Sequence, residues 1–165
     1  MFFRDKRESP PTTEGMPLMP LKEVVVLPHV NLSLLVGRPR SVAAVHEANR
    51  RNGEILLVTQ RAGDRDEHGP DDLYDIGTIA HIEQTLHLPD GNMKVVVSGR
   101  RRARVGTVHR TEPCFLVDAE EIPPSEVTRE VQHRVRTVKT TFETYQKHNR
   151  EVPAEMVLAV NAMED

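Results

Sequence analysis

The chain has 165 residues, of which 28% are charged and 38% are hydrophobic, and its formal net charge at pH 7 is -3. A chain of this length can bury one sizeable core, with about two-thirds of its unfolded surface hidden on folding, and it has no apolar run near the roughly 18 residues that a membrane-spanning helix needs. The acidic balance and the 4% aromatic content argue against capture of nucleic acid by the whole surface, and the single cysteine, Cys114, excludes an internal disulfide and favours a reducing, cytoplasmic compartment.

The N-terminal part of the chain predicts a flexible leader followed by two strands. Residues 1–16 are polar and have little apolar surface to offset the entropy of ordering. Residues 18–27 are rich in β-branched and apolar side chains but contain a proline, which predicts an extended strand at a sheet edge because proline cannot donate to a ladder. Residues 32–36 predict a second short strand that Gly37 ends.

The next segments predict a helix, a strand and a loop. Ser41 is a suitable N-cap, and apolar residues at helical spacing follow it, so we expect a short helix over residues 41–51. Residues 54–60 have the continuous apolar pattern of a buried strand. Residues 61–72 are charged, contain glycine and proline and lack periodicity, which predicts a surface loop.

Two extended runs around an Asp-Gly pair are the strongest structural signal. Residues 76–88 and 93–99 flank Pro89-Asp90-Gly91-Asn92, which predicts a β-hairpin because such turns need positive φ. Residues 103–109 and 115–122 predict two further strands. The expected fold class is therefore α+β, with a small, largely antiparallel, barrel-like sheet and one short helix.

The C-terminal part predicts helices. From Ser125, the predicted cap, valines and then Phe142 and Tyr145 recur every three or four residues, so we expect an amphipathic helix over residues 125–148. A second helical pattern begins near Met156 and stops at Asp165 without a C-cap glycine. We therefore expect that the chain is cut artificially or by a protease there.

The sequence contains no catalytic signature. Phosphate-binding Gly-x-x-x-x-Gly-Lys-[Ser/Thr], His-Glu-x-x-His, Cys-x-x-Cys and Gly-x-Ser-x-Gly motifs are all absent. The eight histidines are scattered, which indicates structural or surface roles rather than metal binding. We therefore expect no catalytic residue, no metal and no cofactor in this chain. The arginines of residues 99–104 could contact phosphates, but the acidic balance favours solvent-facing arginines paired with carboxylates.

Six segments in this order resemble the LON substrate-binding domain at the N-terminus of Lon-type ATP-dependent proteases. They are residues 17–29, 35–41, 57–60, 72–78, 88–95 and 99–104. The resemblance implies a PUA-like β-domain over residues 17–122 and the start of a helical subdomain over residues 125–165. In the family these precede an AAA+ ATPase, which would need ATP and magnesium, and a Ser–Lys peptidase. Neither module has a counterpart in this sequence.

The resemblance also implies recognition of unfolded, misfolded or degron-bearing proteins for a hexameric protease. Exposed apolar side chains on a rigid sheet suit that task, because unfolded chains display hydrophobic segments. The expected binding residues are the apolar Leu32, Leu34, Leu86, Leu88 and Met93, with Arg38 and Arg40 adding discrimination by charge.

Two other functions stay open. One is a stand-alone adaptor with the same domain and no motor. The other is an RNA-binding module, since PUA-like folds can bind RNA, although the net charge disfavours nucleic acid. The apolar face of the helix after Ser125 predicts self-association, as a dimer of this chain or as part of the hexamer, and no membrane contact is expected.

Overall fold

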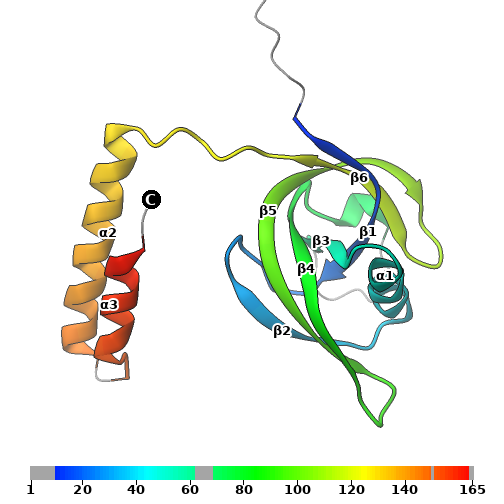
Figure 1. The fold of residues 1–165 in the computed structure, drawn as a ribbon, viewed down its shortest axis with the longest axis horizontal. Helices are drawn as coiled ribbons and strands as arrows, with labels where there is room; N and C mark the ends of the chain where they lie inside the picture. The colour runs from blue at the N-terminus through cyan, green and yellow to red at the C-terminus, as the bar shows by residue number, and fades with distance from the viewer. Residues whose placement is uncertain (1–9, 62–68, 150, 164–165) are drawn as a thin grey trace, which may run out of the picture. The chain divides into compact units, whose positions relative to one another are not determined.

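The computed structural model describes residues 10–61, 69–149 and 151–163, which form two compact units divided after Pro123 (Figure 1). The first unit contains β1 (Thr12–Leu21), β2 (Asn31–Val36), α1 (Pro39–Arg50), β3 (Glu54–Thr59), the 3-10 turn η1 (Pro70–Asp72), β4 (Ile76–His87), β5 (Met93–Arg110) and β6 (Phe115–Glu121). The second unit contains α2 (Arg129–His148) and α3 (Ala154–Ala162).

Five strands of the first unit close into a barrel. β5 pairs with β4, β4 with β3, β3 with β1, β1 with β6, and β6 returns to β5. All these pairs are antiparallel except β1–β3, which is parallel and needs the crossover through β2 and α1. The expected α+β fold with a barrel-like sheet is confirmed, whereas the parallel pair was not predicted.

The length of β5 explains how a sixth strand joins the barrel. The first part of β5, residues 93–98, pairs with β2, and its last part, residues 103–110, pairs with β6. The sequence predicted two separate strands here, but Gly99 lets one strand pass beneath the loop after β1. A Cβ on Gly99 would lie 2.2 Å from the Leu27 carbonyl oxygen, so only glycine permits this approach. β2 is consequently the edge strand of the sheet.

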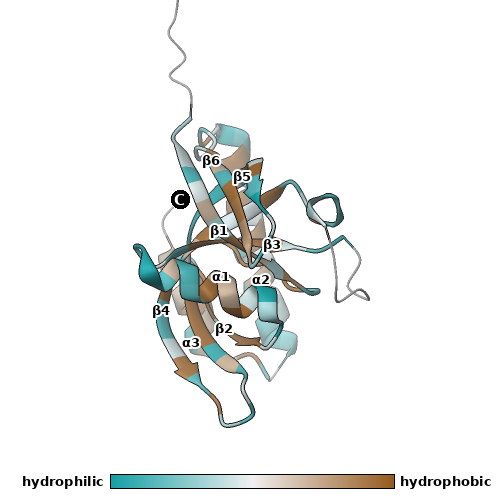
Figure 2. Cartoon of the chain, turned by 90° about the vertical axis from the view of Figure 1, so that its right-hand side faces the viewer, coloured by the Kyte–Doolittle hydropathy of each residue, from teal (hydrophilic) through white to brown (hydrophobic). Residues whose placement is uncertain are grey.

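The core is divided into two buried clusters on opposite faces of β3. Ile55 and Leu57 belong to the cluster that packs against Val45 of α1, whereas Leu56 and Val58 belong to the other. Burial of both faces explains why β3 is apolar at consecutive positions. Apolar residues accordingly recur along the strands and on part of α1 (Figure 2).

Two predicted boundaries near the N-terminus are wrong. β1 begins at Thr12 and Met16 is buried, so the leader predicted over residues 1–16 is too long. The reason is pairing with β6, about a hundred residues away, which local composition does not report. Residues 1–9 of that leader lie outside the described residues. β1 also ends at Leu21 rather than Leu27, and residues 22–30 form a loop.

The predicted helix start at Ser41 is also wrong. α1 begins at Pro39, where the proline takes the first helical position because its missing N–H needs no partner there. Ser41 is buried inside the helix instead of capping it. Of the predicted loop over residues 61–72, residues 62–68 lie outside the described residues, and η1 forms its end.

The second unit is a pair of helices. Thr128, rather than the predicted Ser125, caps α2, and its side chain accepts a hydrogen bond from the Val131 amide at 3.3 Å. The Asn161 side chain on α3 donates to the Glu143 carboxylate on α2 at 2.7 Å, which ties the two helices together. No helix among the described residues is long and apolar enough to cross a membrane.

Candidate functional site

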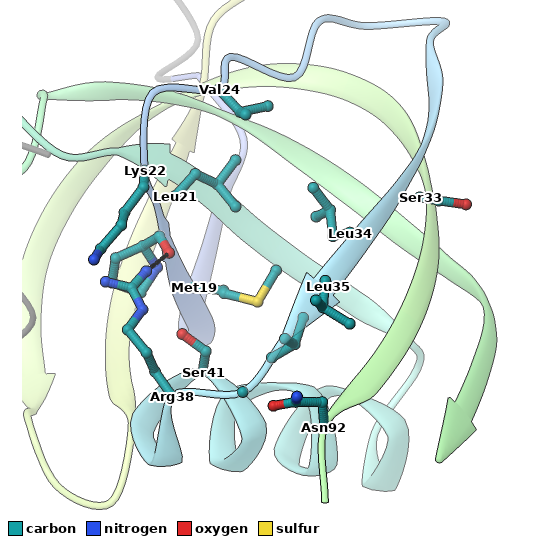
Figure 3. Close-up of a pocket in the computed structure, with 13 residues that line it drawn as sticks. Met19, Leu21, Lys22, Val24, Ser33, Leu34, Leu35, Arg38, Ser41 and Asn92 are labelled. Carbon is teal, nitrogen blue, oxygen red and sulfur yellow. Dashed lines mark hydrogen bonds between the residues drawn. The ribbon is translucent and has the colours of Figure 1, made fainter. Parts of the chain in front are cut away.

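The candidate site is a groove between the end of β1 and the edge strand β2. We call it the β1–β2 groove. Its volume is about 540 Å³, and its walls are residues 19–22 and 24, residues 33–38, Ser41 and Asn92. Met19, Leu21 and Leu34 point into the space between the two strands, whereas Ser33 points away (Figure 3). The groove is therefore lined by apolar side chains from two strands that do not pair with each other.

The groove exists because each of the two strands has a strand partner along one edge only at this place. β1 pairs with β6 only as far as Leu18, so residues 19–21 carry no β6 partner, and Pro20 has no amide proton to donate. β2 pairs with β5 along one edge, and no other described strand pairs with it. Unpaired strand edges of this kind can accept an additional extended chain.

A loop of exposed apolar residues borders the groove and is held in place by two threonines. The Thr59 hydroxyl of β3 donates to the Val24 carbonyl at 2.6 Å, and the buried Thr78 hydroxyl of β4 donates to the Val26 carbonyl at 2.7 Å. Val26 is buried, while Val24, Val25 and Leu27 are exposed. The loop thus presents apolar side chains to solvent on a fixed backbone.

Arg38 closes the end of the groove where β2 meets α1. Its guanidinium donates to the Pro20 carbonyl at 2.6 Å and to the Gln60 side-chain oxygen at 2.8 Å. Arg38 therefore links the end of β1 to the residue after β3 and places a positive charge beside the edge of β1 that β6 does not cover (Figure 3).

The turn between β4 and β5 borders the same end of the groove, on the side of Gly37 away from Arg38 (Figure 3). The Asn92 backbone and side-chain amides donate to the Asp90 carboxylate at 3.0 and 2.8 Å, and these hydrogen bonds lower the pKa of Asp90. The Asn92 side chain also packs against Gly37, where a Cβ would lie 2.2 Å from its oxygen. The turn is consequently locked onto the entry to α1.

A cross-strand row of exposed side chains continues from the groove. Leu35 on β2 and Leu86 on β4 both lie opposite Lys94 of β5 in the strand register, and residues directly opposite share one face of the sheet. Leu35 is 70% exposed and Leu86 is 52% exposed. Leu35 belongs both to this row and to the groove wall.

The structure brings only some of the predicted binding residues together. Leu34 and Arg38 line the β1–β2 groove, and Leu86 lies in the adjoining row. Leu32 and Leu34 are partly buried against the core rather than fully displayed. Leu88 is half-buried at the end of the hairpin arm.

Two predicted residues lie elsewhere. Met93 is 1% exposed, so its predicted role as a displayed contact is wrong: it faces inward at the start of β5, opposite the buried Val36. Arg40 does not line the groove. Its guanidinium lies over the Phe115 ring, 4.7 Å from the centroid, and pairs with Glu112.

The sequence reasoning missed Leu35 and the loop valines. Strand alternation could have found Leu35, because inward Leu34 and Val36 leave the residue between them on the outer face. Val24 and Val25 could not be found this way, since their run resembles a strand and becomes a loop only through its threonine anchors.

The arginine run is partly neutralised, as expected. Arg100 pairs with Glu83 at 3.0 Å, and Arg101 pairs with Glu54 at 3.0 Å and with Glu121 at 2.9 Å. Arg102 and Arg104 form no ion pair with any described residue. Surface pairs of this kind stabilise little, and they reduce the positive charge available to a phosphate backbone.

The titratable side chains of the described residues do not converge on a metal site. Within the described part of the chain, His109 pairs tightly with Asp118 at 2.6 Å, and this hydrogen bond lowers the pKa of Asp118. Asp118 also accepts from the Gly15 amide at 3.2 Å, so the pair holds β5, β6 and β1 together. Its role is structural, and it lies apart from the groove-lining residues.

Comparison with known proteins gives consistent matches. The family model described as the ATP-dependent protease La (LON) substrate-binding domain matches residues 15–165. Lon protease 3 of Sorangium cellulosum is 39% identical over 169 residues, covering 100% of this chain and 20% of that protein. Lon protease of Escherichia coli K12 is 38% identical over 151 residues, covering 91% of this chain and 19% of that protein. The chain thus spans about a fifth of these relatives.

Solved structures support the fold. The N-terminal domain of the Mycobacterium avium complex Lon protease superposes with a TM-score of 0.73 at 24% identity, covering 92% of this chain and 77% of that one. The Lon N-terminal domain protein from Xanthomonas campestris superposes with a TM-score of 0.56 at 22% identity, covering 78% of this chain and 73% of that one.

Proposed function

Because the chain belongs to the family of the Lon substrate-binding domain, we propose that it captures unfolded or degron-bearing polypeptides in the β1–β2 groove for an ATP-dependent protease. The observation that carries the proposal is an apolar groove bounded by the free edge of β2, with Leu35 70% exposed at its wall. The role assigned to this chain is binding, and peptide cleavage is left to other parts of the protease.

The chemistry of the groove suits an unfolded client. An extended segment can add backbone hydrogen bonds along β2 while alternate apolar side chains enter the groove beside Met19 and Leu34. A folded protein offers neither the unpaired backbone nor the apolar side chains, so the same surface discriminates against it. Selection by hydrophobicity rather than by a fixed motif fits a binder of many clients.

One groove by itself should bind an unfolded client with modest affinity. Burial of one leucine side chain contributes about 1.5–3 kcal/mol, and a client must lose conformational entropy when it becomes extended. We propose that assembly of the whole protease places several copies of this domain around one client, so that multivalency raises the apparent affinity. Joining two copies of the chain by a flexible linker should therefore tighten binding of a long unfolded client more than binding of a short peptide.

The direct test is binding of a permanently unfolded fluorescent protein, with its folded counterpart and a single-stranded RNA as comparison ligands. We expect preference for the unfolded protein with little dependence on salt. Leu35→Ser should weaken that binding by roughly 5- to 30-fold, since it removes an exposed apolar contact. Leu158→Ser is a matched control, because Leu158 is also 70% exposed but lies on α3.

The outcomes separate the candidate functions. Equal binding by the Leu35→Ser and Leu158→Ser variants would show that clients do not use the groove. Strongly salt-dependent RNA binding without any protein binding would support the RNA-binding alternative instead. Use of the same clients as a Lon protease is tested by competition: excess chain should slow degradation of the same client by a full-length Lon protease, and an unchanged rate would contradict that shared use.

A further inference from the structure

A second pocket lies beside the β1–β2 groove, and we call it the Arg104 pocket. Its volume is about 430 Å³, and its wall includes Val25, Arg61, Tyr74, Asp75, Ile76 and Arg104. Val24 lines the β1–β2 groove and Val25 lines the Arg104 pocket, so a single loop separates the two. The Thr59 hydroxyl, which also lines the Arg104 pocket, fixes that loop through the Val24 carbonyl at 2.6 Å.

The first arginine of the pocket, Arg61, already has an ion-pair partner. The Arg61 guanidinium lies over the Tyr74 ring, 4.9 Å from the centroid. It donates to the Leu73 carbonyl at 2.9 Å and to the Asp75 carboxylate at 3.0 Å. Arg61 and Asp75 therefore neutralise each other, and Tyr74 is held as a fixed wall.

The second arginine leaves the pocket positively charged. The Arg104 side chain makes no hydrogen bond or ion pair within the described part of the chain. Glu120 lies opposite Arg104 in the register of β5 and β6, but its carboxylate lies beside Gly106 instead. A guanidinium thus borders a pocket that also holds the Arg61–Asp75 pair and the exposed apolar or aromatic side chains of Val25, Tyr74 and Ile76.

We propose that the Arg104 pocket is a second subsite for polypeptide clients, which selects an acidic side chain adjacent to an aliphatic or aromatic one. The carboxylate pairs with the Arg104 guanidinium, whose fork of N–H donors matches a carboxylate geometrically. The neighbouring side chain packs on Val25 and Ile76 or against the Tyr74 ring. This inference rests on the proposed function, because the client that enters the β1–β2 groove continues past Val25 into the pocket.

The subsite adds a preference for acidic clients, which apolar contact alone does not provide. Hydrophobic burial in the β1–β2 groove does not depend on charge, whereas Arg104 favours an acid and disfavours a lysine or arginine at the same client position. Because the pocket is open to solvent, the ion pair between Arg104 and the client carboxylate raises the affinity only modestly.

The test uses two fluorescent peptides with an apolar core that differ only by Glu or Gln at one flanking position, both amidated at the C-terminus. We expect the Glu peptide to bind the wild-type chain about three- to tenfold more tightly, with the difference shrinking as salt rises. Arg104→Gln should abolish that difference. Arg102→Gln, two residues along β5 and outside the pocket, is the matched control and should keep the difference.

Each alternative result overturns a defined part of the argument. A Glu preference that persists in Arg104→Gln, or that disappears in Arg102→Gln as well, refutes the Arg104 subsite. A Gln peptide with a free C-terminal carboxylate that outcompetes the amidated Glu peptide refutes the choice of an acidic side chain. Equal binding of both peptides together with binding of the unfolded protein refutes the subsite alone, whereas failure of every polypeptide to bind refutes the proposed function.

Discussion

Replacing Thr78 with valine tests the idea that hydrogen bonds hold the apolar loop in place. Thr78 is 3% exposed, and its hydroxyl donates to the Val26 carbonyl at 2.7 Å. Valine has nearly the same shape but cannot donate, so the substitution leaves a buried carbonyl without its partner. The expected loss in the free energy of unfolding is about 1–3 kcal/mol. For a unit of this size that loss corresponds to a fall in Tm of roughly 4–12 °C.

The assay is urea denaturation followed by circular dichroism, with Thr85→Val as the control. The Thr85 hydroxyl accepts only an exposed hydrogen bond from Asn49 at 3.3 Å, so its loss should cost less than about 0.5 kcal/mol. The m-value should be unchanged in both variants, because the surface exposed on unfolding is the same.

The Thr78→Val variant should also bind unfolded clients more weakly than Thr85→Val does, since the loop that separates the two pockets loses an anchor. A stability loss no larger than that of Thr85→Val would refute the argument that the buried hydroxyl stabilises the loop. A large stability loss with unchanged client binding would show that the loop is held for the fold and not for recognition.

Further predictions concern close packing, buried volume and titration. Gly99→Ala should destabilise the chain by several kcal/mol, because its Cβ would meet the Leu27 carbonyl oxygen, whereas Gly69→Ala, with open space around it, should be within about 0.5 kcal/mol of wild type in the same denaturation assay. Leu56→Ala removes a fully buried side chain and should cost about 2–5 kcal/mol in the same assay. The pKa of Asp118, lowered from its ordinary value of 3.8 by the hydrogen bond from His109, should move back toward that value in His109→Ala, as followed by NMR titration of the carboxyl group. Its stabilising contribution is complete above pH 3.8 and is lost as the pH falls through the lowered pKa; an unchanged pKa in that variant would contradict the assignment.

Local features of the sequence determined most of the elements. The apolar run of β3 and the turn between β4 and β5, where Gly91 has a φ of 85°, need only neighbouring residues to be recognised. The valine stripe of α2 is likewise a local periodicity. The order of several weak motifs was enough to indicate the family, because they are spread over most of the chain.

The tertiary structure alone decided which apolar residues are displayed. The beginning of β1 is set by pairing with β6, and the exposure of Val25 depends on threonine hydroxyls from β3 and β4. Arg104 has no ion-pair partner among the described residues because the Glu120 carboxylate on the neighbouring strand β6 lies beside Gly106. Composition and periodicity report the conformation that a segment prefers and how many of its faces are buried, but not which distant segment covers each face. That pairing is settled only when the barrel closes, and it decides which apolar residues border the two pockets.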